Sequence, residues 1–212
     1  MRTNCYLMNL NNTCLVIDPG AASKSVDKWL KNNCQHGNIS IFLTHGHFDH
    51  ISGVKPIVSQ YPNTEVYVSS KDEKHLFSTR WNLGCWVLKL TTLKSIKDKL
   101  HYVEKNDTIQ FGDELFYIHT LPGHTPGGLG LYSQKHNLIF TGDTLFKSAR
   151  GSTSFIGGNY TDMMQSLYDL FTYIPGNATV YPGHYATTTI ADEMKRYEII
   201  RQSRSVTRKE EL

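Results

Sequence analysis

The sequence predicts an α/β protein in which two packed β-sheets are covered on their outer faces by helices. Segments with the residue pattern of strands alternate along the chain with segments at helical spacing. The strand-like segments form two series, and helices follow each series. Because 212 residues are enough for one sizeable hydrophobic core, we expect a single domain that spans residues 1–212.

The first series of strands is expected in the N-terminal half of the chain. Short apolar segments bounded by turn residues occur at residues 4–8, 13–17, 39–43 and 65–68. Ser23 can begin a helix, whose apolar residues follow at helical spacing: Val26, Trp29, Leu30 and Cys34. A second helix is expected at residues 54–60. Residues 70–100 show no single period, which predicts helical or irregular cover.

The second series of strands begins after His101. Its segments lie at residues 108–111, 115–120, 129–133 and 138–141, before a helix at 162–171 and a last strand that ends at Val180. Thr189 and Asp192 have the spacing of a capping box, which predicts the start of a C-terminal helix. We expect residues 201–212 to fray.

Composition and charge argue against several classes of protein. The formal net charge of +3 is too small to indicate a nucleic-acid-binding protein. The sequence contains no run of 18 apolar residues that would span a membrane, and its first residues do not resemble a secretory signal. The four cysteines, Cys5, Cys14, Cys34 and Cys85, include no CxxC pair. We interpret them as reduced thiols of a cytoplasmic protein.

The strongest functional signal is the segment THGHFDH at residues 44–50, which follows an apolar strand. It places His45, His47, Asp49 and His50 within six residues. Imidazole and carboxylate groups are ligands of zinc, iron and manganese, and strand ends present such residues at the edge of a sheet. Because this spacing is rare by chance, the segment predicts a metal site.

Three further segments each add one residue that can bind a metal ion. They are LPGHTPG at 121–127, FTGDT at 140–144 and YPGH at 181–184, which contain His124, Asp143 and His184. Each segment follows a predicted strand and holds its polar residue in a turn that contains glycine. The four segments together predict one metal centre built from distant parts of the chain.

These segments resemble the metallo-β-lactamase superfamily, and within it the glyoxalase II-type hydroxyacylglutathione hydrolases. THGHFDH, PGHTPG, TGDTLF and YPGH carry the resemblance, which extends over residues 3–190 because TNCYL, VIDPG and TTI also match. The resemblance implies a four-layer αββα sandwich. It also implies two divalent metal ions per chain, with zinc expected and iron or manganese as alternatives.

The ligand pattern of the family transfers onto matching residues of this sequence. The resemblance implies two sets of ligands, one for each metal ion: His45, His47 and His124, and Asp49, His50 and His184. Asp143 would bridge the two ions. A hydroxide between the ions would attack the substrate carbonyl. The implied catalytic groups are therefore Asp49 and Asp143, together with this metal-bridging hydroxide.

The sequence departs from the family after Asp143. The chain stops soon after His184 and so resembles the short, single-domain members, which lack the C-terminal helical domain that helps to bind glutathione. Ser152 stands where a basic residue is usual, and this weakens the expectation that glutathione is recognised. Lys147 and Arg150 are basic residues that could replace it, so the candidate substrate-binding residues are Lys147, Arg150 and Ser152.

The predicted function is hydrolysis of a small-molecule thioester, with neither nucleic acid nor a membrane as a partner. A lactonase or another hydrolase of the same fold is the alternative, and the ligands are also compatible with a persulfide dioxygenase that uses one iron ion. A binding protein with an inactive site is disfavoured because every ligand is present. A nuclease is disfavoured because the sequence indicates no basic face.

The remaining five of the ten histidines are expected outside the metal centre. His119 lies in a predicted strand. We expect it to be an ordinary strand histidine whose hydrogen bonds are satisfied there, in preference to one that supports a metal ligand. The other four lie near predicted turns or surfaces and are expected to face solvent: His36, His75, His101 and His136.

Overall fold

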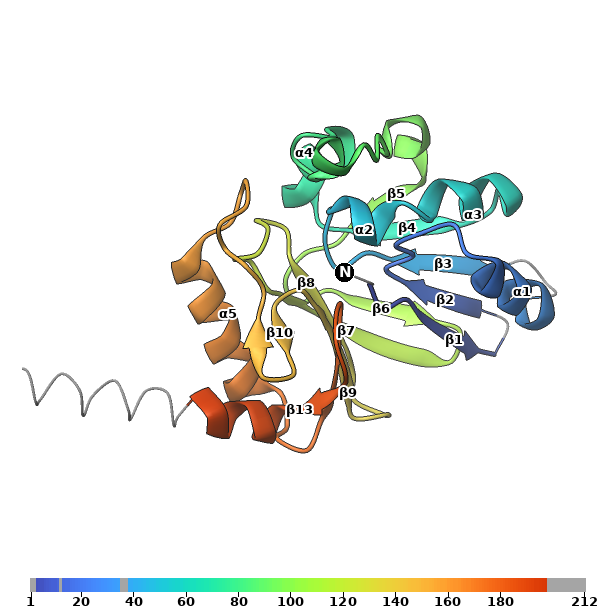
Figure 1. Ribbon diagram of the computed structural model, residues 1–212. Helices are drawn as coiled ribbons and strands as arrows, with labels where there is room; N and C mark the ends of the chain where they lie inside the picture. The colour runs from blue at the N-terminus through green and yellow to red at the C-terminus, as the bar shows by residue number, and fades with distance from the viewer. Residues whose placement is uncertain (1–2, 12, 35–37, 198–212) are drawn as a thin grey trace, which may run out of the picture.

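A computed structural model describes residues 3–11, 13–34 and 38–197 of the chain (Figure 1). Two β-sheets pack against each other, with α1 (Lys24–Asn33) and α3 (Val54–Gln60) outside the first sheet and α5 (Tyr160–Tyr173) outside the second. The arrangement confirms the expected four-layer αββα sandwich.

The first sheet contains five strands in sequence order. They are β1 (Tyr6–Leu10), β2 (Thr13–Ile17), β3 (Ile39–Phe42), β4 (Glu65–Val68) and β5 (Leu100–Tyr102). β1 and β2 form an antiparallel hairpin, whereas β2 to β5 run parallel to one another. The pattern of the sequence located four of these strands to within two residues at each end, and it did not indicate β5.

The second sheet contains six strands in the order β13-β12-β9-β8-β7-β6. Their bounds are β6 (Thr108–Phe111), β7 (Glu114–Thr120), β8 (Leu129–Ser133), β9 (Leu138–Gly142), β12 (Thr179–Pro182) and β13 (Thr188–Thr189). The parallel pair is β12 with β9, and the other neighbours are antiparallel. β12 continues past Val180, where the last strand was expected to end, and β13 follows it. A separate ribbon joins β10 (Leu145–Phe146) to β11 (Ala149–Arg150).

Three apolar clusters separate the four layers. In β2 the side chains alternate, so that Leu15 and Ile17 join the cluster between the sheets while Cys14 and Val16 join the cluster beneath the helices. This period of two lets a single strand contribute to two cores. The third cluster packs the apolar face of α5 against the second sheet.

The segment between β4 and β5 contains short helical turns, as expected. They are α4 (Glu73–Phe77) and 3₁₀ turns at Ser70–Asp72, Gly84–Val87 and Lys94–Lys99. Another short helix, α2 (Phe48–Ile51), lies earlier in the chain, between β3 and α3. The predicted C-terminal helix begins at residue 190, and Thr189 Oγ1 accepts a hydrogen bond from the amide of Asp192 at 3.2 Å. Residues 201–212, which were expected to fray, lie outside the described residues.

No helix within residues 3–11, 13–34 and 38–197 is long and apolar enough to cross a membrane.

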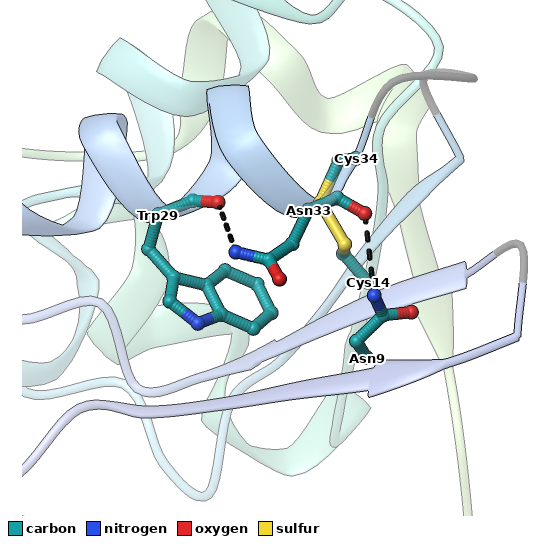
Figure 2. Close-up of a disulfide and its surroundings, with 5 residues drawn as sticks. All are labelled: Asn9, Cys14, Trp29, Asn33 and Cys34. Atoms are coloured by element: carbon teal, nitrogen blue, oxygen red, sulfur yellow. Dashed lines mark hydrogen bonds between the residues drawn. A yellow bond between two sulfur atoms is a disulfide. The ribbon is translucent and has the colours of Figure 1, made fainter.

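The interpretation of Cys14 and Cys34 as reduced thiols is wrong. The two residues form a disulfide, with Cα atoms 6.0 Å apart, that joins β2 to the end of α1 (Figure 2). Nearby, the side chain of Asn9 donates a hydrogen bond to the carbonyl of Asn33 at 3.4 Å. Cys5 and Cys85 are free thiols.

The disulfide between Cys14 and Cys34 escaped sequence analysis because only the packing of α1 on the sheet brings two cysteines 20 positions apart together. Structural disulfides are typical of oxidising compartments, so this one does not support the expected cytoplasmic location.

Reduction of the Cys14–Cys34 disulfide should destabilise the fold. For a closed loop of 20 residues, the loss of free energy of unfolding is expected to be roughly 3 kcal/mol, because the disulfide limits the freedom of the unfolded chain. Urea unfolding with and without reductant measures this difference. A Cys14→Ser/Cys34→Ser variant should match the reduced protein, and Cys85→Ser should still respond to reductant. Equal stability of the oxidised and reduced protein would contradict the prediction.

Candidate metal centre

The predicted ligands lie in loops that leave strands of both sheets. The segment 44–50 follows β3, and its last ligands lie in α2. His124 follows β7, Asp143 follows β9 and His184 follows β12. The structure brings all seven residues together in overlapping groups whose ligand atoms lie within 4.8 Å of one another: His45, His47 and His124; His45, His50 and Asp143; and Asp49, His50 and His184.

The first trio consists of three buried imidazoles. Nε2 of His45 lies 3.1 Å from Nδ1 of His47, and this Nδ1 lies 2.9 Å from Nε2 of His124. The three nitrogens therefore converge on one point. Three converging ring nitrogens are a frequent set of ligands for a divalent transition metal.

The second trio combines two imidazoles with a carboxylate. Oδ2 of Asp49 lies 3.4 Å from Nε2 of His184 and 4.0 Å from Nε2 of His50. Asp49 is the most exposed of the three side chains and faces the cavity described below. The hydroxyl of Thr3 donates a hydrogen bond to its Oδ2 at 3.0 Å, which orients the carboxylate.

Asp143 lies between the two trios. Its Oδ2 is 3.4 Å from Nε2 of His124 and 3.3 Å from Nε2 of His184, while its Oδ1 is 3.4 Å from Nε2 of His50. Gly183 makes this arrangement possible, because a Cβ there would lie 2.3 Å from Oδ1 of Asp143. The carboxylate therefore contacts ligands of both sets.

Two buried atoms of this cluster indicate that it fits a cation. Nε2 of His50 and Oδ1 of Asp143 have no hydrogen-bond partner among the described residues, although both are buried. An unpaired buried polar atom costs free energy, and each such atom calls for an explanation. Imidazole nitrogens and carboxylate oxygens suit zinc, iron and manganese. The residues present therefore fit divalent metal ions.

The protonation of the histidines differs within the cluster. Burial, reinforced by neighbouring imidazoles, lowers the pKa of His45 and His47 well below 6.5, and burial also lowers the pKa of His124. These rings are therefore neutral at pH 7, which is the form that binds metals. Burial acts to lower the pKa of His50 too, but the charges of Asp18 and Asp143 outweigh it and raise this pKa to about 9.

Asp18, which lies in the segment VIDPG, supports the second trio. Its Oδ2 lies 2.9 Å from Nδ1 of His50 and accepts a hydrogen bond from the hydroxyl of Thr44 at 2.6 Å. Its Oδ1 accepts a hydrogen bond from the amide of Thr44 at 2.8 Å. The carboxylate fixes the His50 ring so that Nε2 faces the other ligands. Sequence analysis matched this segment to the family and assigned Asp18 no part in the site.

Asp72 joins the two loops of the first trio. Its buried carboxylate accepts hydrogen bonds from the amide of Gly46 at 2.8 Å, the hydroxyl of Thr125 at 2.9 Å and the amide of Gly127 at 2.7 Å. The contacts hold the loops of His47 and His124 beside each other. Asp72 was not predicted, because it lies in a segment without a clear period.

His75 was expected to face solvent, and this prediction is wrong. The side chain is buried, with Nε2 3.2 Å from the carbonyl of Ile156 and Nδ1 3.5 Å from Oδ1 of Asp72. Its ring packs against that of His47, with 5.5 Å between ring centroids. The irregular segment 70–100 folds back over the metal centre, which no sequence period revealed.

Three other histidines, His101, His119 and His136, lie in described parts of the chain and belong to none of the ligand groups. His101 and His136 have side chains that are 48% and 44% exposed, so they face solvent as expected. His119 is a half-buried residue of β7 that pairs with Gly130 of β8, so it lies in a strand as expected. His36 lies outside the described residues.

The metal centre opens into a cavity of about 1160 Å³. His47, Asp49, His124, Asp143 and His184 form part of its wall. The rest of the wall includes Thr3, Cys5 and Leu7 around the start of β1, and residues between Gly20 and Trp29 in α1 and the loop before it. Phe48, Leu83 and Phe155 also line the cavity.

The structure does not bring the predicted substrate-binding side chains into this cavity. Lys147 is exposed, and the guanidinium of Arg150 lies 5.1 Å from the ring centroid of Tyr160. Ser152 contributes through its backbone, because its carbonyl accepts a hydrogen bond of 2.7 Å from Nδ1 of His124. None of the three residues is part of the cavity wall.

Comparisons with known proteins agree with this geometry. A probable metallo-hydrolase of Bacillus subtilis is 28% identical over 195 residues, covering 91% of this chain and 90% of that protein. A hydroxyacylglutathione hydrolase of Blochmanniella pennsylvanica is 30% identical over 181 residues; these cover 85% of this chain and 61% of the relative, less than two thirds of its length. The crystal structure of the BLEG-1 B3 metallo-β-lactamase is similar with a TM-score of 0.81 and 30% identity, covering 91% of each chain. The model of the metallo-β-lactamase superfamily matches residues 1–197, and this chain therefore belongs to that superfamily.

Proposed function

We propose that this chain is a hydrolase that binds two divalent metal ions, zinc in preference to iron or manganese, and cleaves small-molecule thioesters. The position of Asp143 carries the proposal. Its carboxylate oxygens lie 3.3–3.4 Å from ring nitrogens of both ligand trios, as a residue that bridges two ions requires. The seven ligands and their spacing support two ions in preference to one.

Each ligand has a function that follows from its position. Asp143 and Asp49 supply negative charge that offsets the cations, while the neutral rings of His45, His47 and His124 add no charge. Bound divalent ions would supply a hydroxide from a shared water at neutral pH and would polarise a substrate carbonyl. Asp49, oriented by Thr3, faces the cavity and so lies beside the reacting groups.

The groups around the cavity favour a thioester as substrate. Apart from the ligands, the titratable side chains that the described residues contribute to its wall are Cys5 and Lys24. Burial raises the pKa of the Cys5 thiol to about 12, so this thiol is a poor proton donor. A thiolate leaves without needing a proton, whereas an amine needs one. The hydroxyacylglutathione hydrolase among the relatives supports the same choice.

We predict that Asp143→Asn impairs metal binding at both sites. The unmodified protein should contain about two metal ions per chain by elemental analysis after reconstitution. Asp143→Asn should contain less than one and should lose roughly 10²-fold in thioester hydrolysis, because the bridge loses its charge. His184→Ala should empty mainly the second site. Asp113→Asn, at a surface turn, is the matched control and should retain both ions.

The same protein preparation separates the alternative reactions. Thioesters, lactones and β-lactams are assayed in parallel, and oxygen consumption is measured with a persulfide. Thioester hydrolysis that a chelator abolishes and zinc restores is the expected outcome. Protein without metal above trace levels, or full activity in strong chelator, would rule out the proposed mechanism. Faster turnover of a lactone or β-lactam, or uptake of oxygen, would replace the proposed reaction with that alternative.

Asp18→Asn should weaken metal binding at the second trio by roughly 10- to 100-fold, because the amide cannot accept all the hydrogen bonds that hold His50 and Thr44. Competition with a chromophoric chelator measures the affinity, with Asp113→Asn as the control. Binding at the first trio should change less, because His47 and His124 do not contact Asp18. Unchanged affinity at both sites would show that Asp18 does not position His50.

The stability of the metal-free protein should fall as pH rises from about 6.5 to about 9. The pKa of folded His50 is raised to about 9, so folding retains a proton that the unfolded chain loses above 6.5. The folding equilibrium constant should drop by up to about tenfold per pH unit in this window. Urea unfolding in chelator measures it, and His50→Gln should remove the slope. A flat profile in the unmodified protein would contradict the raised pKa.

A further inference from the structure

The cavity next to the metal centre extends well beyond the ligands. Its volume of about 1160 Å³ exceeds the roughly 300–1,000 Å³ typical of small-molecule sites. A lactoyl or acetyl group fills only a small part of such a space. The part of the wall remote from the ligands comes from β1 and from the first two turns of α1.

The floor of this remote part is apolar and held in place. Leu7, Val26 and Trp29 line the cavity and also pack against the core cluster between the first sheet and its helices. Cys5 lies beside them, and burial raises the pKa of its thiol to about 12, so it presents a neutral surface. Half-buried apolar groups in a concave wall favour an apolar ligand, because burial removes their remaining surface from water.

Apolar residues continue from this floor to the ligands. Phe155 lies with its ring centroid 6.0 Å from those of both His47 and His124. Phe48 and Leu83 also line the cavity. Among the residues that the structure describes, Lys24 is the one lysine or arginine in the wall of this cavity, and it is exposed at the first residue of α1. A substrate therefore meets a mostly apolar surface along this path.

We propose that this groove, floored by Leu7, Val26 and Trp29, binds an apolar acyl chain, so that the substrates are acyl thioesters with a chain of several carbons. The inference rests on the proposed thioester hydrolysis. The thiol half of a biological thioester is polar, so only the acyl half matches the apolar floor. With the carbonyl beside Asp49 and the ligands, the acyl chain extends over Trp29 towards the start of α1.

A homologous series of substrates tests the groove. S-acyl derivatives of N-acetylcysteamine, from acetyl to octanoyl, are hydrolysed by the metal-reconstituted protein. KM should fall about fourfold per added methylene, the fold-change that corresponds to about 0.8 kcal/mol of apolar burial, with kcat nearly constant. A KM that does not depend on chain length would overturn the proposal.

Variants of the floor residues distinguish an effect on binding in the groove from a general effect on folding. Trp29→Ala should flatten the dependence of KM on chain length, while Trp29→Phe should preserve most of this dependence. Trp86→Ala is the matched control, because Trp86 is 75% exposed and does not line the cavity. If Trp29→Ala does not fold, Val26→Thr conserves volume and should reduce the slope. An unaltered slope in folded floor variants would overturn the proposal.

Binding of thioethers distinguishes failure of the groove from failure of the proposed reaction. S-ethyl to S-octyl thioethers of N-acetylcysteamine cannot be hydrolysed, and calorimetry measures their affinity directly. Affinity that rises with chain length and is lost in Trp29→Ala supports the groove, even where no thioester is cleaved. Cleavage of thioesters with no dependence of thioether affinity on chain length would overturn the groove and leave the proposed reaction intact.

Discussion

The structure depends on five buried imidazoles and two carboxylates, of Asp49 and Asp143, that lie within a few ångströms of one another. Such a cluster is costly, because polar groups lose water and several buried atoms gain no hydrogen bond from the described residues. Asp143 offsets part of this cost, since its carboxylate contacts His50, His124 and His184. A divalent cation would offset the rest, which is why the cluster fits a metal centre better than any protein-only hydrogen-bond network.

The rest of the fold holds these side chains in fixed positions relative to one another. Strands of both sheets deliver the ligands, and carboxylates outside the cluster lock the loops together. Asp18 fixes His50 from the first sheet, while Asp72 ties the loop of Gly46 to the loop of Gly127. The close approach of Gly183 to Asp143 leaves no room for a Cβ atom. The ligand geometry is therefore set by tertiary contacts between segments far apart in the sequence.

The sequence predicted what local pattern encodes. β2, α3 and β4 matched their expected bounds because each is a short segment with an apolar pattern of its own, bounded by turn residues. The candidate ligands, which the structure brings together, could be named because four stand close together in residues 44–50 and the others follow strands in glycine turns. The disulfide, buried His75 and the support from Asp72 were missed. Each depends on packing between distant segments, and residues 70–100 carry no period from which their path could be inferred.

The same distinction explains why motif reasoning did not locate the wall of the cavity. Motif reasoning looked for substrate contacts at Lys147, Arg150 and Ser152, beside Asp143 in the sequence, yet none of these residues lines the cavity, whose wall includes residues of β1 and α1. The loops that carry the ligands are constrained by hydrogen bonds to Asp18 and Asp72, so a change there disturbs the metal centre. The face of α1 has no such contacts with the ligands, and its far end is fixed to β2 by the disulfide (Figure 2). The candidate ligands and the α1 part of the cavity wall therefore lie on separate elements, and the disulfide links α1 to β2.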